Sequence, residues 1–314
     1  MTKSIVAIVT TGVRPSYQQV LEAVKRSVTL AGGLESAASP GGLVLIKPNL
    51  VAPPPSAESG ACTSANVCRA LYDVVADLGG RPVIAESSAR GVDTEAVMRL
   101  MGYSALRDRG YQVVDLKQTP TVKVPVLDGH VLDQVTTYEL AMEAEAIISV
   151  PVMKTHDQTD VTLSLKNLKG LVIDAEKRRI HQLGLFEGVS DLAGLFRPAY
   201  ALVDGIIGQE GLGPVYGLPV RMGLLVAGAD PLSVDGVASE IMGFDRCQVR
   251  LLRIAEERGV GILDPQRVQV VGERIEDVRR RFMRMEEDER IKVQGVRVLH
   301  DEESCTGCRN GQQR

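Results

Sequence analysis

Residues 43–86 read LVLIKPNLVAPPPSAESGACTSANVCRALYDVVADLGGRPVIAE, and this succession of patterns is typical of an α/β fold. Short apolar runs at 43–46 and 82–85 have the length and composition of buried strands. Between them, the consecutive prolines at 53–55 remove backbone donors and predict a stiff loop over 51–60. Apolar residues at 67, 70, 71, 74, 75 and 78 then follow a 3.6-residue period, which predicts a helix over 65–78.

The same alternation continues on both sides of this stretch. Further short apolar runs lie at 5–9, 146–150, 200–203 and 223–227, and an amphipathic pattern predicts a helix over 18–30. Strands that alternate with helices in this way predict an α/β protein whose mostly parallel sheet carries helices on both faces.

A change of composition divides the chain near its C-terminal end. Residues 273–290 are dense in Arg and Glu, with Val278, Phe282 and Met285 spaced as one apolar stripe. Because the charges are mixed in sign, this segment is predicted to be a solvated surface helix rather than a basic binding patch. We therefore expect an α/β core domain over 1–272, followed by a charged helix and a short C-terminal tail over 273–314.

Composition narrows the class of protein. The chain has 314 residues and a formal net charge of −4, so it has no global basic field that would attract nucleic acid or an anionic membrane. No apolar run approaches the roughly 18 residues that a membrane-spanning helix needs. The five cysteines lack the dense spacing of a secreted disulfide scaffold, which favours a reducing compartment, and we expect a cytoplasmic protein.

Polar side chains stand where the first predicted strands end. Lys47 and Asn49 follow the strand at 43–46, and Thr63 precedes the helix at 65–78. A cation and an amide at a strand end suit a carboxylate or a phosphate. A solvated turn explains Lys47 equally well, and helix capping is sufficient to explain Thr63. Glu86 closes the strand at 82–85 and is placed either for ligand or metal contact or for a turn.

Residues 151–170, PVMKTHDQTDVTLSLKNLKG, are the leading candidate for a binding or catalytic site. The polar set in this segment is Lys154, His156, Thr162, Lys166, Asn167 and Lys169. So many cations near a strand end predict a negatively charged ligand. If residues 161–168 are helical, Thr162, Lys166 and Lys169 share one face. The alternative is a lysine-rich surface helix that keeps the protein soluble.

The same segment predicts catalytic chemistry. A lysine crowded by like charges has a lowered pKa and can act as a base or nucleophile, and histidine titrates near neutral pH. We therefore expect Lys154, His156 and Lys166 to be catalytic. A little downstream, Lys177 and His181 are placed to cover the same pocket as a lid.

A glycine-rich segment, DGIIGQEGLGP at 204–214, follows the strand at 200–203. Its glycines permit close approach of the backbone to a ligand, so Gly211 and Gly213 are expected to contact the substrate. Asp204 and Glu210 are candidates to bind a divalent cation or to orient a lysine. Further along, capping of the next helix explains Asp230, whereas Asp235 is open to either interpretation.

Cys305 and Cys308 form a Cys-x-x-Cys pair close to the end of the sequence. Two thiolates at this spacing supply half of a zinc or iron–sulfur ligand set. Cys62 and Cys68, a partner chain, or the remainder of a longer protein are the candidates to complete it.

Several motifs, in this order, resemble the domain-of-unknown-function family 362 over roughly residues 5–245. They are KPNL at 47–50, PVMKTH at 151–156, SLKNLKG at 164–170, EKRRIH at 176–181, DGIIGQEGLGP at 204–214 and DPLSVD at 230–235. The resemblance implies an α/β protein, often joined to a ferredoxin-like segment, and an iron–sulfur cluster as the meaning of Cys305 and Cys308. This chain lacks the further Cys-x-x-Cys and Cys-Pro elements of such a segment. The resemblance implies no particular reaction for this sequence.

The favoured hypothesis is an iron–sulfur-associated oxidoreductase, or an electron-linked enzyme, that acts on a small anionic substrate. The residues expected to bind the substrate are Lys47, Asn49, Thr63, Asn167, His181, Gly211 and Gly213. The alternatives are a non-catalytic zinc- or cluster-binding protein and a redox-neutral enzyme with a divalent metal on Glu86, Asp204 and Glu210. The expected partners are a small anionic ligand, a redox protein and a second copy of the chain.

Overall fold

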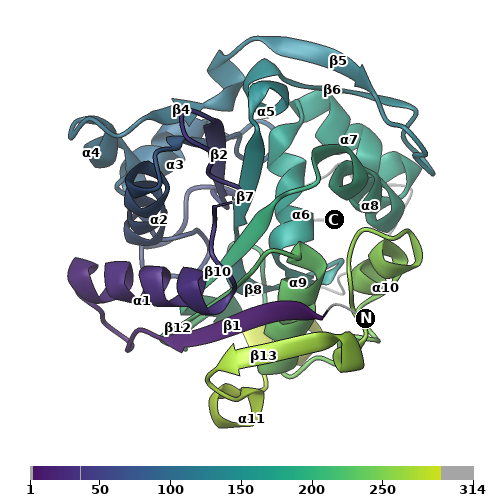
Figure 1. The fold of residues 1–314 in the computed structure, drawn as a ribbon. Coiled ribbons are helices and arrows are strands. Elements are labelled where there is room, and N and C mark those ends of the chain that lie inside the picture. The colour runs from purple at the N-terminus through teal and green to yellow at the C-terminus, as the bar shows by residue number, and fades with distance from the viewer. Residues whose placement is uncertain (1–2, 36, 291–314) are drawn as a thin grey trace.

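The central element of the fold is an 11-stranded sheet, seen in a computed structural model that describes residues 3–35 and 37–290 (Figure 1). Its main strands, in spatial order, are β13 (Val268–Gly272), β1 (Ser4–Thr10), β12 (Leu224–Gly228), β10 (Tyr200–Glu210), β7 (Ala146–Val150), β2 (Leu43–Pro48), β3 (Arg81–Glu86) and β4 (Val113–Asp115). Three short strands extend it: β8 (Val152–His156) pairs with β10 and with β9 (Asp160–Thr162), and β11 (Leu218–Val220) pairs with β10.

The sheet is mostly parallel, as the alternation of strands and helices predicts. The pairs from β10 through β7, β2 and β3 to β4 all run parallel. One interior strand runs the other way, because β12 is antiparallel to both β1 and β10. The predicted fold class is thereby confirmed.

Helices cover both faces of the sheet and close two separate hydrophobic cores (Figure 1). One core includes α1 (Tyr17–Leu30), α2 (Ala65–Asp77), α3 (Thr94–Leu100) and α4 (Tyr103–Arg107). The other includes α6 (Ser164–Asn167), α7 (Asp174–Leu183), α8 (Leu185–Phe196), α9 (Pro231–Ile241) and α10 (Arg250–Glu257). In the described part of the chain, no helix is both long and apolar enough to cross a membrane.

The two helices predicted from periodicity are confirmed almost residue for residue. Helix α1 begins one residue earlier than predicted, and α2 ends one residue earlier than predicted. The apolar positions that carried the α2 prediction, Val67, Leu71 and Val75 among them, are buried against the sheet. The proline-bearing stretch 51–60 has no helix or strand, as its lack of backbone donors requires.

Several short elements carry no pattern strong enough to be predicted. They are the separate hairpin of β5 (Thr121–Pro125) and β6 (Gln134–Tyr138), helices α5 (Glu139–Glu143) and α11 (Ile275–Val278), and the 3-10 turns η1 (Leu116–Gln118), η2 (Leu168–Leu171), η3 (Pro265–Arg267) and η4 (Met285–Glu287). None of them exceeds five residues, so their local periodicity is too brief to read.

The predicted helix over 161–168 is only half present. Residues 160–162 form strand β9, which pairs antiparallel with β8, and α6 begins at Ser164. Thr162 therefore stands opposite Lys154 in the hairpin and does not share a helical face with Lys166 and Lys169. Tertiary pairing with β8 overrides the local lysine spacing.

The predicted surface helix over 273–290 is wrong. Between α11 and residue 288 the chain has no regular structure except η4, and Phe282 is buried in the core. The amides of Arg280 and Phe282 donate to the carbonyls of Ile241 and Met242, each at 2.9 Å. These carbonyls at the end of α9 need partners, and the amides of Arg280 and Phe282 supply them. Cys305 and Cys308 lie outside the described residues.

Candidate active site

A cavity of about 80 Å³ lies where β2 and β3 end, enclosed by β8, β9, α6 and α7. Among the described residues that line it, the cationic side chains are Lys47, Arg90, Lys154, Lys166, Lys169, Lys177 and Arg178. The lining also contains His156, His181 and one carboxylate, Glu86. The ends of parallel strands are where α/β proteins bind ligands, and here that position is strongly cationic.

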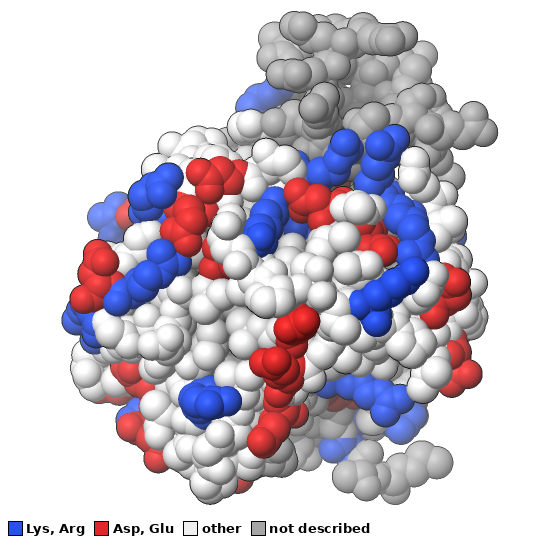
Figure 2. All heavy atoms as spheres, turned by 90° about the horizontal axis from the view of Figure 1, so that it is seen from above, with Lys and Arg blue, Asp and Glu red and all other residues white. Residues whose placement is uncertain are grey.

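These lysines are not surface side chains. Lys154 is 0% exposed, and Lys166 and Lys169 are each 8% exposed. The alternative of a lysine-rich surface helix is therefore wrong. On the face of the molecule that Figure 2 shows, basic and acidic side chains are intermingled, so no single sign of charge dominates that surface. The concentration of positive charge lies inside the protein, where the dielectric constant is lower.

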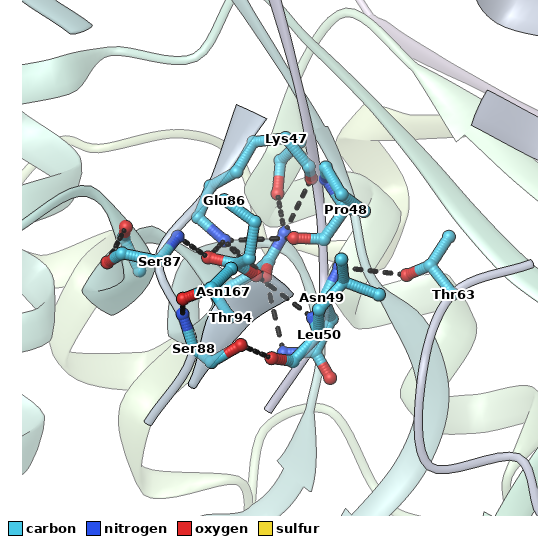
Figure 3. Close-up of polar contacts among 12 residues, drawn as sticks. Lys47, Pro48, Asn49, Leu50, Thr63, Glu86, Ser87, Ser88, Thr94 and Asn167 are labelled. Atoms are coloured by element: carbon cyan, nitrogen blue, oxygen red, sulfur yellow. Dashed lines mark hydrogen bonds and ion pairs between the residues drawn. The ribbon is translucent and has the colours of Figure 1, made fainter. Parts of the chain in front are cut away.

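Lys47 forms a buried ion pair with Glu86. Its Nζ lies 2.9 Å from both Glu86 oxygens and also donates to Pro48 O and Asn167 Oδ1, each at 2.9 Å (Figure 3). Burial lowers the pKa of Lys47, and the Glu86 carboxylate opposes that effect. Lys47 borders the cavity, but four acceptors already surround its ammonium group. The structure thus gives this lysine an internal role as the counterion of Glu86.

Position 170 requires glycine for a steric reason that the sequence does not reveal. A Cβ atom at this position would lie 2.1 Å from Glu86 Oε1 and 2.5 Å from Lys47 Nζ. Any side chain at 170 would therefore collide with the ion pair. The residue marks the point at which the turn after α6 passes over the Lys47–Glu86 pair.

His156 and Lys166 form a polar pair inside the cavity, with 3.1 Å between Nε2 and Nζ. The Gln158 amide lies 3.0 Å from His156 Nδ1, and an Asp157 carboxylate oxygen lies 2.8 Å from the same atom. If Gln158 donates, the ring proton is on Nε2 and Lys166 accepts it as a neutral amine. If Nδ1 donates to Asp157, Lys166 can donate to Nε2 as an ammonium ion. The pair can therefore change its tautomer as Lys166 gains or loses a proton.

Helix α7 closes the other side of the cavity. Lys177 Nζ donates to the carbonyls of Ser87 at 3.1 Å and Ser88 at 2.7 Å, just after β3. Burial lowers the pKa of Lys177 to about 8, and nearby Asp174 opposes the shift. One turn later, His181 Nε2 contacts Lys169 Nζ, and burial together with Lys169 holds the pKa of His181 well below its usual range. The cavity thus contains two lysine–histidine pairs.

The position of α6 depends on Asp235 in α9. The Asp235 carboxylate accepts hydrogen bonds from the amides of Ser164 at 2.8 Å and Leu165 at 3.0 Å, and from the Ser164 hydroxyl. It therefore satisfies the first amides of the helix that carries Lys166. Burial raises the pKa of Asp235 to about 7. The sequence left Asp235 ambiguous because its partners lie about 70 positions away.

Residues 44–240 match the family described as Domain of unknown function (DUF362). The chain belongs to the DUF362 family. The matched range includes every residue of the cavity.

Two known proteins are similar to this DUF362 chain. The thylakoid-associated protein sll1697 of Synechocystis sp. is 28% identical over 258 residues, which cover 78% of this chain and 77% of that protein. The lactate racemase apoprotein of Thermoanaerobacterium thermosaccharolyticum superposes with a TM-score of 0.49 at 12% identity. That comparison covers 77% of this chain, and the chain spans 57% of the length of the racemase.

The DUF362 cavity brings together most of the residues predicted to form the site. Those that line it are Lys47, Asn49, Lys154, His156, Lys166, Asn167 and His181. Thr63 lies just behind it: its hydroxyl donates to Val150 O at 2.7 Å and accepts from the Asn49 amide at 2.9 Å. Thr63 thus links two strand ends and does not cap α2. The catalytic and binding roles of these residues stay predictions.

Gly211 and Gly213 are not among the residues that line the cavity. A Cβ atom on Gly213 would lie 2.1 Å from Thr155 O, and one on Gly211 would lie 2.5 Å from Asp288 Oδ2. Close packing against β8 and against the segment after η4 therefore explains these glycines, in place of the expected contact with substrate. Pro214 is the residue of this loop that reaches the cavity, where its carbonyl accepts from Lys154 Nζ at 3.0 Å.

The predicted metal ligands Glu86, Asp204 and Glu210 have separate partners. Asp204 accepts from the Ser64 and Ile206 amides at 2.8 and 3.0 Å, and burial raises its pKa to about 6. Glu210 pairs with Arg280 at 3.0 Å. Within residues 3–35 and 37–290, no group of three or more His, Cys, Asp or Glu is arranged to hold a metal ion. The expected three-carboxylate site is therefore not assembled, and neither Asp204 nor Glu210 orients a lysine through the contacts described.

The buried state of His156 predicts a dependence of stability on pH. Burial and Lys166 lower its pKa from 6.5 to about 4, so between these values the unfolded chain binds a proton that the folded protein does not. The resulting stability is present above pH 6.5 and lost as the pH falls towards 4. We expect His156→Asn to remove about 2 kcal/mol of the difference in unfolding free energy between pH 7 and pH 5. Urea unfolding at the two pH values measures this, and equal differences for variant and wild type would contradict it.

Proposed function

We propose that this DUF362 protein is an enzyme that binds a small anion in the cavity and moves a proton through the His156–Lys166 pair. The observation that carries the proposal is the composition of the described lining, in which seven cationic side chains accompany a single carboxylate. That carboxylate, Glu86, is already paired with Lys47. The remaining lining therefore favours a negatively charged group of small size.

The placement of the lysines supports this function over a purely structural one. Burying a cation is unfavourable unless opposite charge or hydrogen-bond acceptors compensate for lost hydration. Lys47 and Lys177 receive such compensation from Glu86 and Asp174. Lys154 donates to two backbone carbonyls, Lys166 lies beside His156, and both lysines line the cavity. An anion bound in the cavity would place a negative charge beside both of them.

The His156–Lys166 pair supplies the chemical step. Burial and Lys166 hold the pKa of His156 near 4, so its imidazole is neutral at pH 7 and can accept a proton. A bound anion would favour the protonated ring and raise that pKa towards neutrality. Proton transfer next to a bound acid is therefore the reaction class that the geometry supports. Lys154 and Lys166 hold the acid, and Asn49, which is positioned by Asn167, orients it.

The redox part of the expected function remains a proposal. An iron–sulfur cluster would be held by Cys305 and Cys308, which lie outside the described residues. Support for it comes from their Cys-x-x-Cys spacing. Iron, sulfide and zinc analysis of protein purified without oxygen tests this part, with Cys305→Ser/Cys308→Ser as the control. Iron with stoichiometric sulfide favours an electron-linked enzyme, whereas zinc alone favours a non-catalytic metal-binding protein.

Anion binding is tested by titrating the protein with acetate and with inorganic phosphate at low ionic strength. We expect saturable binding and a rise in the pKa of His156, followed by NMR of its imidazole. Lys166→Met should weaken binding at least tenfold, because one buried charge-assisted contact contributes about 1.5–3 kcal/mol. Lys25→Met is the matched control, since Lys25 is an exposed lysine in an ion pair on the surface. Absence of saturable binding, or equal affinities for Lys166→Met and wild type, would refute the proposed site.

A further inference from the structure

We infer that the ligand of this cavity is a small hydroxy acid whose hydroxyl group donates a hydrogen bond to Asn49 Oδ1. The inference rests on the proposed anion site and adds a second requirement to it. The evidence is the direction in which each amide of the Asn49–Asn167 pair must point, which the surrounding groups determine (Figure 3).

The orientation of Asn167 is determined from two sides. Its Nδ2 lies 3.0 Å from the backbone carbonyl of Lys47, which can only accept, and 3.1 Å from the Ser149 hydroxyl, which itself donates to Ser164 O. Its Oδ1 lies 2.9 Å from Lys47 Nζ, which donates. Turning the amide over would place oxygen against oxygen on one side and donor against donor on the other. Asn167 must therefore present its Oδ1 to the group beside it.

That group is Asn49, whose orientation follows. Asn49 Nδ2 donates to Asn167 Oδ1 at 3.4 Å, which leaves Asn49 Oδ1 as an acceptor on the other side of the amide. This oxygen is buried, and it has no hydrogen-bond partner among the described residues. Asn49 lines the cavity, and so does Thr162, whose buried hydroxyl also lacks a partner in the described part of the chain. The wall of the cavity thus includes an amide oxygen that has no donor among the described residues.

An acid group alone cannot meet this requirement. A carboxylate at neutral pH only accepts hydrogen bonds, so it suits the lysines but leaves Asn49 Oδ1 without a donor. A buried acceptor that stays unpaired is unfavourable, and a ligand that pairs it is bound more tightly than its analogue without the donor. A ligand that carries a donor beside its acid group would pair this oxygen as well as the lysines. The cationic lining disfavours an ammonium group there, so we assign a hydroxyl.

The volume of the cavity is consistent with this class of ligand. About 80 Å³ admits an acid with a short carbon skeleton, and Asn49 and Lys166 border the same space. An acid group near Lys166 and a hydroxyl near Asn49 can then belong to one small molecule. The Thr162 hydroxyl can donate to or accept from either group.

The test compares glycolate with acetate, which differ only by the hydroxyl group. Calorimetric titration should give about tenfold tighter binding of glycolate to the wild type, the effect of one buried hydrogen bond. Asn49→Leu removes the acceptor and should bring the ratio of the two affinities close to one. Asn49→Gln retains both the amide donor and the acceptor oxygen and should keep glycolate ahead, which provides a second test if the leucine variant does not fold.

Each outcome separates this inference from the proposed function. If acetate binds and glycolate binds no better, the hydroxy-acid assignment is overturned while the anion site stands. If neither acid binds, the proposed anion site itself fails. If glycine binds more tightly than glycolate, the donor is an amino group and the assignment of a hydroxyl is overturned.

Discussion

Replacement of Lys47 by methionine is expected to lower the free energy of unfolding by roughly 3–5 kcal/mol, the usual effect of removing one partner of a buried ion pair. Glu86 would be left buried without its cation, still accepting the amides of Leu50 at 3.0 Å and Ser87 at 2.8 Å. Asn167 would also lose its contact with Lys47 Nζ. Equilibrium unfolding in urea at pH 7 measures the change.

Two further variants show whether the cause is the unpaired charge. Lys47→Met/Glu86→Gln removes both charges, keeps an acceptor at position 86, and should recover a large part of the lost stability. Lys25→Met breaks an exposed ion pair with Asp77 and should change stability by less than about 1 kcal/mol. A Lys47→Met protein within 1 kcal/mol of the wild type would show that the Lys47–Glu86 pair does not hold the strand ends together.

Replacement of Asp235 by alanine is expected to have two effects at once. The buried amides of Ser164 and Leu165 lose their acceptor, and the Ser164 hydroxyl keeps only Pro231 O, which should lower the free energy of unfolding by about 3 kcal/mol. Because α6 also carries Lys166 and Asn167, the affinity for acetate should fall at least tenfold. Urea unfolding and calorimetric titration measure the two effects separately.

Asp230→Ala is the matched control for this variant. Asp230 caps α9 by accepting the amides of Leu232 at 3.0 Å and Ser233 at 3.1 Å, and none of its described hydrogen bonds is to α6. We expect Asp230→Ala to lower stability and to leave the affinity for acetate within twofold of the wild type. If both variants reduced the affinity equally, the effect of Asp235 would be a general loss of folding and not the positioning of Lys166.

The features that could be predicted from the sequence are those that local pattern determines. The periods of α1 and α2, the proline loop and the succession of buried strands each depend on neighbouring residues, and each is confirmed. The concentration of lysines between 154 and 169 also indicates a cavity, because polar residues that follow a buried strand lie at its end.

The features that were missed depend on contacts between distant residues. The sequence places Lys47 at a strand end, but it does not reveal that Glu86, 39 positions away, pairs with its ammonium group. The segment 273–290 has a helical spacing of apolar residues. Its Arg280 and Phe282 amides nevertheless donate to carbonyls at the end of α9. The glycines at 211 and 213 indicate close approach of the backbone, but the sequence does not say that the neighbour is β8 and the segment after η4.

The reversed strand in the middle of the sheet has a consequence for how the protein acquires its structure. Strand β1 precedes the other described strands in the sequence, yet it pairs with β12 and β13, so that Ala7 is opposite Ala227 and Ser4 is opposite Val268. A chain that emerges from the ribosome with its N-terminus first must keep this apolar segment unpaired until most of the protein has been synthesised. Closing such long loops slows folding and leaves an aggregation-prone strand exposed meanwhile. Synthesis of β12 and β13 therefore sets the earliest moment at which this edge of the sheet forms.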